Sequence, residues 1–319
     1  MKVLANDGIS KEGIEKLEAS GFEVSTTHVP QSELIDVINS EKYVALLVRS
    51  ATTVRKEIID ACPSLKFIGR GGVGMDNIDV SYARDKGLIV ENTPAASSQS
   101  VAELVMGAMF AISRSLHDSY NKMPQIGHTE FNTLKKKYGK GIELKDKTLL
   151  IIGFGRIGQS LASYALGIGM KVIAVDMITT TRQIPIQISG LENLHINITP
   201  SSDLMDVIGS ADFISIHVPK QSDGSAVISK KEIAAMKNGV RIVNAARGGV
   251  IDEDELMIAL NSGKIAAAAL DVFENEPIPR ADLLAHQQIA STPHIGAATQ
   301  EAQDRIGGEL ANKIIDALK

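Results

Sequence analysis

The stretch TLLIIGFGRIGQSLASYALGIGMKVIAVD, residues 148–176, decides the fold of this chain. An apolar run leads directly into Gly153, Gly155 and Gly158, and a segment with helical periodicity follows. Glycines at this spacing between a strand and a helix let the backbone approach a pyrophosphate, whose charge the helix N-terminus favours. Asp176 ends the next apolar run, where its carboxylate can accept hydrogen bonds from both hydroxyls of an adenosine ribose. The stretch therefore predicts a βαβ unit that binds a dinucleotide.

The identity of the dinucleotide follows from the same aspartate. NAD fits better than NADP, because the Asp176 carboxylate would repel a 2′-phosphate on the ribose. A tight glycine turn in an unrelated α/β protein would explain the glycines alone, but not a strand, a helix and an aspartate in register. We therefore predict NAD as the cofactor.

Apolar runs alternate with helix-period segments on both sides of this stretch. The strand-like runs are KVLAN, FEVST, VALLV, LKFIGR and GLIVENT before it, and ADFISIHVP, GVRIVNAARG, KIAAAALDVF and QIASTPH after it. Strands separated by helical patterns of this length indicate βαβ units and parallel sheets. The predicted fold class is α/β, with two doubly wound parallel-sheet domains of the Rossmann-like or flavodoxin-like kind.

A chain of 319 residues is long enough for two packed domains, and the dinucleotide motif lies near its middle. We predict a substrate-binding domain made of residues 1–94 and 296–319, with an NAD-binding domain, residues 95–295, inserted in it. The C-terminal segment after Thr299 has helical periodicity and predicts a terminal helix.

Three other segments carry local predictions. Apolar residues from Val101 to Leu116 recur at helical spacing, and Ser100 and Glu103 stand in capping-box register, so we predict one connecting helix opened by that box. The less regular residues between positions 176 and 203 are expected outside the main sheet. The lysine run at positions 135–137 is expected in a solvated loop.

Composition excludes several classes of protein. With 44% hydrophobic and 22% charged residues, and no uncharged apolar run of about 18 residues, a membrane span is not expected. The N-terminus lacks the features of a signal peptide, and the single cysteine, Cys62, cannot form a disulfide within the chain, so we expect a cytoplasmic protein. A net charge of -5 gives no general attraction to nucleic acid or anionic lipid. The histidines show no metal-ligand spacing, and we predict no metal site.

Three reactive side chains follow predicted strands: Arg247 in VNAARGGVID, Glu276 in LDVFENEP and His294 in STPHIG. Ligands of open α/β sheets bind at the carboxyl ends of the strands, so these residues are candidates for chemistry. Oxidation of an alcohol by hydride loss needs a base, and histidine suits this role when a carboxylate orients it. Arginine can hold a substrate carboxylate with its planar fork. Singly, they could instead be a surface charge, a residue of an exposed proline turn and a core histidine.

Arg49 raises a similar question, because it follows the apolar run of ALLVRSATT. A guanidinium group at the end of a buried strand either extends to solvent or binds an anion. The residues of this stretch alone leave both possibilities open.

Taken together, these motifs resemble the D-isomer-specific 2-hydroxyacid dehydrogenases. The resemblance covers essentially the whole chain and rests on GFGRIG followed by VD, SIHVP, NAARGG, ALDVFENEP and PHIGAAT. It implies that Arg247 binds and polarises the substrate, that His294 is the acid/base and that Glu276 pairs with His294. Besides the three glycines and Asp176, it implies cofactor contacts at Val73, Arg156, Ile157, His217, Val218, Pro219, Ala245, Ala246, Arg247, Asp271, His294, Gly296 and Ala297.

The first predicted domain is most similar to the members of that family that oxidise 3-phospho-D-glycerate, the first step of serine biosynthesis. LLVRSAT, FIGRGGVGMDNID and ENTPAAS carry this similarity. It implies a phosphorylated 2-hydroxy acid as substrate, with contacts at Arg49, Ser50, Arg70, Gly72 and Val73. Val73 stands where similar enzymes can have a threonine, so a hydroxyl contact to the cofactor is in doubt.

The resemblance also bears on assembly and regulation. It implies a homodimer or a higher homo-oligomer, with the long helix after position 98 as a surface that could join subunits. Because the sequence ends at Lys319, we expect no regulatory domain of the kind that binds serine in longer relatives. Two alternatives stay open: reduction of glyoxylate or hydroxypyruvate with the same catalytic residues, and an NAD-sensing binding protein similar to the corepressors of this family.

Overall fold

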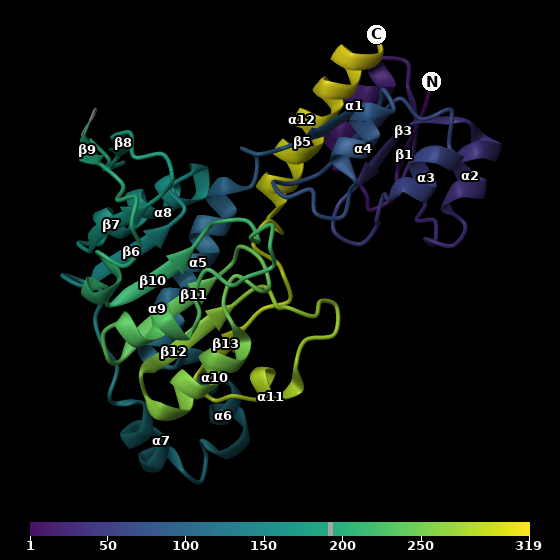
Figure 1. Ribbon diagram of the computed structural model, residues 1–319. Helices are drawn as coiled ribbons and strands as arrows, with labels where there is room; N and C mark the ends of the chain where they lie inside the picture. The colour runs from purple at the N-terminus through teal and green to yellow at the C-terminus, as the bar shows by residue number, and fades with distance from the viewer. Residues whose placement is uncertain (191–193) are drawn as a thin grey trace. The chain divides into compact units, whose positions relative to one another are not determined.

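The computed structural model describes residues 1–190 and 194–319 and divides into two compact units. Unit 1 comprises Met1–Ser100 and Ala297–Lys319, and unit 2 comprises Val101–Gly296. Figure 1 shows both units with most of their elements labelled. The second unit is thus continuous in sequence and lies between the two segments of the first. None of the helices in the described residues is long and apolar enough to cross a membrane.

Unit 1 is a five-stranded parallel sheet with helices on both faces. Its elements are β1 (Lys2–Ala5), α1 (Lys11–Ala19), β2 (Glu23–Ser25), α2 (Leu34–Glu41), β3 (Tyr43–Val48), α3 (Lys56–Ala61), β4 (Phe67–Arg70), α4 (Val80–Asp85), β5 (Ile89–Asn92) and α12 (Gln300–Leu318). The strand order is β2-β1-β3-β4-β5, and every neighbouring pair is parallel. Leu4 packs with α2, α3 and α4, whereas Val3 and Ala5 pack with α1 and α12. The alternation of side chains along a strand thus supplies two buried faces.

Unit 2 is a six-stranded parallel sheet, also covered on both faces. Its elements are α5 (Ser98–Arg114, which begins at the end of unit 1), α6 (Leu116–Ile126), α7 (Phe131–Tyr138), β6 (Thr148–Ile152), α8 (Arg156–Gly167), β7 (Lys171–Val175), β8 (Arg182–Pro185), β9 (His195–Ile198), the 3-10 helix η1 (Ile208–Ser210), β10 (Phe213–Ile216), α9 (Lys230–Ala235), β11 (Val240–Asn244), α10 (Glu253–Ser262), β12 (Ile265–Leu270), α11 (Ala281–Leu284) and β13 (Ile289–Ser291). The order is β13-β12-β11-β10-β6-β7. The parallel α/β fold class predicted from the sequence is confirmed.

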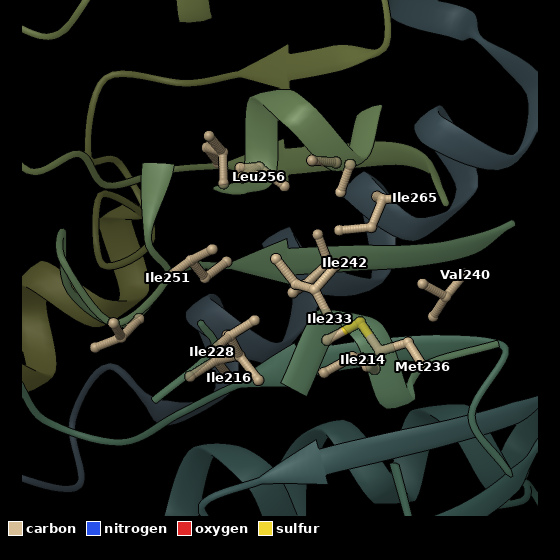
Figure 2. Close-up of a cluster of buried hydrophobic side chains, with 14 of the residues drawn as sticks. Ile214, Ile216, Ile228, Ile233, Met236, Val240, Ile242, Ile251, Leu256 and Ile265 are labelled. Atoms are coloured by element: carbon tan, nitrogen blue, oxygen red, sulfur yellow. The ribbon is translucent and has the colours of Figure 1, made fainter. Parts of the chain in front are cut away.

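The core of unit 2 has one apolar layer on each face of the sheet. Helices α5 and α8 contribute to one layer, and α9, α10 and α11 contribute to the other. Figure 2 shows part of the second layer, where Ile242 of β11 lies among Ile214 of β10, Ile233 of α9 and Leu256 of α10. Because these strands are buried on both faces, their sequences are almost continuously apolar.

The strand order reverses once in each unit. In unit 1 the chain passes from β1 to β2 on one side and returns to β3 on the other side of β1. In unit 2 the corresponding reversal lies between β6 and β10. Ligands of open α/β sheets bind at the carboxyl ends of strands next to such a switch point.

The connecting helix differs from the prediction at both ends. Helix α5 begins at Ser98, so Ser100 lies inside the helix, where its buried hydroxyl is 2.7 Å from Oγ1 of Thr299. The predicted capping box was therefore wrong, because a tertiary contact uses the Ser100 hydroxyl. The helix also ends before Leu116, since Ser115 adopts a left-handed φ of 51° and a second helix, α6, follows.

Two further segments can be compared with their predictions. Lys135, Lys136 and Lys137 lie in the last turns of α7 rather than in a loop, and Lys137 pairs with Asp118 at 2.5 Å. Strands β8 and β9 form a separate antiparallel pair, so the segment after Asp176 lies outside the main sheet, as expected. The part of this prediction that falls on residues 191–193 lies outside the described residues. The terminal helix is confirmed, and the Thr299 side chain caps it by accepting from the Ala302 N–H.

Candidate active site

The glycine loop after β6 has the geometry of a phosphate cradle. Gly153 has a φ of 91°, and a Cβ there would lie 2.6 Å from the main-chain oxygen of His217, so only glycine fits. A Cβ on Gly158 would overlap the Gly153 carbonyl, and its absence lets α8 approach the loop closely. By contrast, a Cβ on Gly155 would meet no described atom within 4 Å. The loop is therefore tightly packed on the protein side and open at the N-terminus of α8.

Asp176 follows β7 and is held beside this loop. Its Oδ2 accepts from the Phe154 N–H at 2.6 Å, and its Oδ1 accepts from the Ile178 N–H at 2.9 Å. Each carboxylate oxygen has two acceptor positions, so both can still accept a ribose hydroxyl. The arrangement fits the ribose of an NAD cofactor.

His217 follows β10, across the switch point from Gly153. Its Nε2 lies 2.9 Å from the hydroxyl of the fully buried Ser215, while its buried Nδ1 has no hydrogen-bond partner within the described part of the chain. Burial lowers the pKa of His217 to about 4, so the ring is neutral at physiological pH. A buried ring nitrogen that the protein does not satisfy fits a bound group at this edge of the sheet.

The remaining predicted cofactor residues take varied positions. Most follow strands of unit 2 or begin α8, whereas two lie in unit 1. In unit 2, Ile157, Val218, Ala245, Ala246 and Arg247 are half-buried, Gly296 is buried, and Arg156, Pro219 and His294 are exposed; in unit 1, Val73 is exposed and Ala297 is half-buried.

His294 and Glu276 form a hydrogen-bonded pair, although they are 18 residues apart. Nδ1 of His294 lies 2.8 Å from Oε2 of Glu276, and about a third of each side chain is exposed. The other carboxylate oxygen, Oε1, accepts from the Phe273 N–H at 3.0 Å. A carboxylate held in this way fixes the orientation of the imidazole and leaves Nε2 to exchange a proton with a ligand.

Asp271 holds the loop that carries His294. Its Oδ1 accepts from the Thr292 hydroxyl at 2.6 Å and the Ile295 N–H at 2.8 Å, and its Oδ2 accepts from the Gly296 N–H at 2.8 Å. Asp271 is only 4% exposed, so these are short bonds to a buried carboxylate. His294 lies within this loop with a left-handed φ of 54°. Sequence reasoning assigned Asp271 to the cofactor alone and missed its contacts within the chain.

Arg247 lies in the loop after β11, and Asn244 organises that loop. The Asn244 side chain accepts from the Ala246 N–H at 3.0 Å and donates to the Arg247 carbonyl at 2.9 Å. The Asn244 carbonyl also accepts from the Asp271 N–H at 2.9 Å, which ties this loop to the end of β12. Asn244 was missed in the sequence, although an asparagine at the end of an apolar run was a usable signal. The structure thus places Arg247 and His294 at the same, carboxyl edge of the sheet.

In unit 1, the predicted substrate residues lie at or just after the carboxyl ends of β3 and β4. Arg70, at the end of β4, donates from Nη2 to the Ser50 hydroxyl at 3.4 Å and from Nη1 to the Gly71 carbonyl at 3.2 Å. Gly72 has a φ of 137° and donates its N–H to the Thr93 hydroxyl at 2.8 Å. The loop after β3 thus meets the loop after β4.

Asp7 is a further residue of this region that the sequence reasoning missed. It follows β1, and its Oδ2 accepts from the N–H groups of Arg49 at 2.6 Å and Thr52 at 3.0 Å. Its Oδ1 accepts from the Thr52 hydroxyl at 2.5 Å. An acidic residue directly after the first strand was the available signal. Asp7 therefore anchors the backbone of Arg49 at the switch point of unit 1.

Comparison with known proteins identifies the family. The model of the D-isomer specific 2-hydroxyacid dehydrogenase, NAD binding domain, matches residues 106–296. Hydroxypyruvate reductase of Thermotoga maritima is 43% identical over 321 residues, which cover 99% of this chain and 98% of that protein. D-3-phosphoglycerate dehydrogenase of Methanocaldococcus jannaschii is 40% identical over 319 residues. This match covers 100% of the present chain but 58% of the archaeal protein.

A solved structure gives the same result. The crystal structure of NAD⁺-bound 3-phosphoglycerate dehydrogenase of Entamoeba histolytica is similar with a TM-score of 0.77 and 27% identity, covering 99% of this chain and 94% of that one. The region matched by the family model contains both the glycine cradle and the His294–Glu276 pair, and the cofactor of this oxidoreductase is NAD. The chain belongs to the D-isomer specific 2-hydroxyacid dehydrogenase family.

Proposed function

We propose that this dehydrogenase oxidises 3-phospho-D-glycerate to 3-phosphooxypyruvate. The observation that carries the proposal is the pair of arginines at the carboxyl ends of β3 and β4, where Arg70 reaches the hydroxyl of Ser50, the neighbour of Arg49. Arginine forks and hydroxyl groups are the groups that bind phosphate well. The similarity to proteins named D-3-phosphoglycerate dehydrogenase supports the same substrate. The reaction would be the first step of serine biosynthesis and would take place in the cytoplasm.

The proposed chemistry uses three residues of unit 2. Arg247 binds the carboxylate of the substrate and polarises the oxygen on C2. His294 takes the proton of the C2 hydroxyl on Nε2, because Nδ1 faces the Glu276 carboxylate. Glu276 orients the ring and stabilises its protonated form. NAD would supply the hydride acceptor for C2 when bound. In the reverse direction His294 returns the proton.

The proposed NAD contacts follow from the cradle. The N-terminus of α8 and the open face of Gly155 would hold the pyrophosphate, and Asp176 would hold the adenosine ribose. His217 would line the cofactor from the end of β10, as a neutral group. The other predicted cofactor residues retain the roles that the family resemblance implies.

Reduction of hydroxypyruvate is the second candidate. The match to the hydroxypyruvate reductase of Thermotoga maritima favours it, because that match extends over nearly the full length of both proteins. Hydroxypyruvate differs from 3-phosphooxypyruvate only by the missing phosphate, so both reactions can use Arg247, Glu276 and His294. The same residues also suit the reduction of glyoxylate, an alternative that the sequence left open.

A comparison of the two substrates separates these candidates. We expect NADH-dependent reduction of 3-phosphooxypyruvate with a higher kcat/KM than that of hydroxypyruvate. Arg49→Ala should raise the KM for the phosphorylated substrate about tenfold to 100-fold, the equivalent of one or two charge-assisted hydrogen bonds, with a smaller effect on hydroxypyruvate. The control is Arg55→Ala, because Arg55 lies in the same unit but pairs with Asp79 at 3.0 Å.

Three outcomes decide between the proposals. A preference for hydroxypyruvate that Arg49→Ala leaves unchanged would establish the second candidate. A preference for glyoxylate would point to another reductase of the same family. Failure to reduce any of the three 2-oxo acids would contradict both candidates.

We also propose that the chain assembles as a homodimer. Helix α5 of unit 2 carries Phe110 with 43% of its surface exposed, and Tyr120 and Met123 of α6 are exposed as well. Large apolar side chains grouped on neighbouring helices are typical of subunit contacts. The molar mass in solution, measured by light scattering, tests the proposal, and a monomer at micromolar concentration would contradict it.

A further inference from the structure

The loops that carry Arg247 and Glu276 are packed directly against each other. Gly248 follows Arg247, and a Cβ on Gly248 would overlap the carbonyl of Phe273 and lie 2.7 Å from the main-chain nitrogen of Glu274. No side chain fits between these two stretches of backbone. A shift of the Phe273–Glu276 turn therefore also disturbs the loop after β11.

Glu253, the first residue of α10, holds this turn from outside. The residue is 5% exposed, and its Oε1 accepts from the Glu274 N–H at 2.9 Å. In return, Oε1 of Glu274 lies 3.4 Å from the Glu253 N–H and accepts from it. The start of a helix and the turn are thus joined by two reciprocal contacts between side chain and backbone.

The helix that supplies Glu253 is itself well anchored. Asp252 caps α10 by accepting from the Glu255 N–H at 3.0 Å, and Leu256 lies in the buried layer shown in Figure 2. The Glu253 side chain therefore extends from a fixed point in the core, whereas the turn that it holds is a loop.

The turn carries Glu276 to His294. Its internal bond runs from the Phe273 N–H to Oε1 of Glu276, and the Glu276 Oε2 contacts Nδ1 of His294 at 2.8 Å. A short chain of hydrogen bonds thus leads from Glu253 through the backbone of residues 273 and 274 to the imidazole. The position of Glu253 matters for the histidine although Glu253 does not touch it.

The Glu253 carboxylate is unfavourable for folding in its ionised form. Burial is the main reason that the pKa of Glu253 is raised, the Glu274 N–H and the Arg280 charge lower it, and the carboxylates of Glu274 and Asp254 raise it. Because the folded pKa is raised, this residue favours folding at low pH, and that contribution is lost as the pH rises through the folded pKa. A neutral acceptor of the same shape would avoid this loss of stability.

We propose that Glu253 is a positioning residue of the dehydrogenase reaction, which holds the Glu274 N–H so that Glu276 is aimed at His294. The proposal rests on the roles proposed above for Glu276 and His294. We assign Glu253 no contact with substrate or cofactor. Its effect on the reaction passes through Glu276 alone.

The test compares three single variants and one double variant of Glu253 and Glu276. The reaction is measured in the reduction direction, where His294 must be protonated. Glu253→Ala should lower kcat about tenfold, since small misplacements of catalytic groups cost this much or more, and should leave the Kd of NADH unchanged. It should also shift the alkaline limb of the kcat/KM profile to lower pH, because His294 loses part of its carboxylate partner. Glu276→Gln should shift that limb further in the same direction. Glu253→Gln keeps an oxygen that can accept from the Glu274 N–H. It should therefore keep kcat within about twofold of the wild-type value and leave the alkaline limb at its wild-type pH.

The double variant Glu253→Ala/Glu276→Gln shows whether the effect passes through Glu276. We expect it to match Glu276→Gln alone, because two changes that act through one group are not additive. Asp254→Ala is the control. Asp254 is next to Glu253 in sequence, but its carboxylate is 80% exposed and pairs with Arg280. It should alter neither kcat nor the pH profile. If Glu253→Ala does not fold, Glu253→Asp, which is one methylene too short to reach Glu274, replaces it.

Each contrary result has its own meaning. A lower Tm for Glu253→Ala with unchanged kcat and pH profile would show a merely structural role and overturn the proposal. An additive loss in the double variant would also overturn it, because Glu253 would then act by another route. If Glu276→Gln itself left the pH profile unchanged, the proposed role of Glu276 would fail first.

Discussion

The two units of this chain share a topology, but different groups lie at their switch points. In unit 1, the carboxylate of Asp7 occupies the switch point and accepts from the N–H groups of Arg49 and Thr52. In unit 2, Gly153 follows the corresponding strand β6, and the open backbone at Gly155 comes next. An internal carboxylate satisfies the backbone donors of unit 1, whereas bare backbone at a helix N-terminus attracts a phosphate in unit 2. The same fold thus leaves backbone donors open at the switch point of unit 2 and bonds them to a side chain at the switch point of unit 1.

The largest expected effect concerns His294, the proposed acid/base of unit 2. His294→Ala should lower kcat about 1,000-fold, because the loss of a general acid or base removes its contribution to proton transfer. The Kd of NADH, measured by fluorescence titration, should change little, since the cradle is intact. His286→Ala is the matched control, because His286 is a half-buried histidine that lies outside the loop that Asp271 holds. A loss in kcat of less than tenfold for His294→Ala would remove this residue from the chemistry.

The next effect concerns the cradle. Gly153→Ala places a Cβ 2.6 Å from the His217 carbonyl oxygen at a φ of 91°. The strain amounts to about 2 kcal/mol, and the loop should move to relieve it. This movement should raise the Kd of NADH about 30-fold. Gly167→Ala, at the end of α8, is the control, since its Cβ would meet no described atom within 4 Å. Equal NADH affinity in both variants would show that the cradle tolerates a side chain.

The smallest effect on cofactor binding is expected at the switch point of unit 1. Asp7→Ala removes the acceptor for two N–H groups and for the hydroxyl of Thr52, which is 2% exposed. The free energy of unfolding, measured with urea, should fall by about 1–2 kcal/mol, while the Kd of NADH changes less than about twofold. Asp36→Asn, on the exposed side of α2, should change neither value. A weaker NADH complex in Asp7→Ala would show that the two switch points are not independent.

The sequence alone determined the α/β class, the alternation of the main-sheet strands with helices, and the NAD cofactor. These features depend on local patterns, since apolar runs with period two or 3.6 specify elements, and glycine spacing specifies the turn before α8. It also singled out Glu276 and His294, because their residue types suit proton transfer, without showing that they meet.

The tertiary structure decided which side chains hold these residues in place. Asp7, Asn244, Asp271 and Glu253 act through backbone groups of distant segments, and such contacts leave no periodic signal in the chain. The same reason accounts for Ser100, whose hydroxyl suits a helix cap locally but meets Thr299 in the fold. A capping rule considers only hydrogen-bond partners within a few residues along the chain. The folded chain also brings close partners that are far away in sequence.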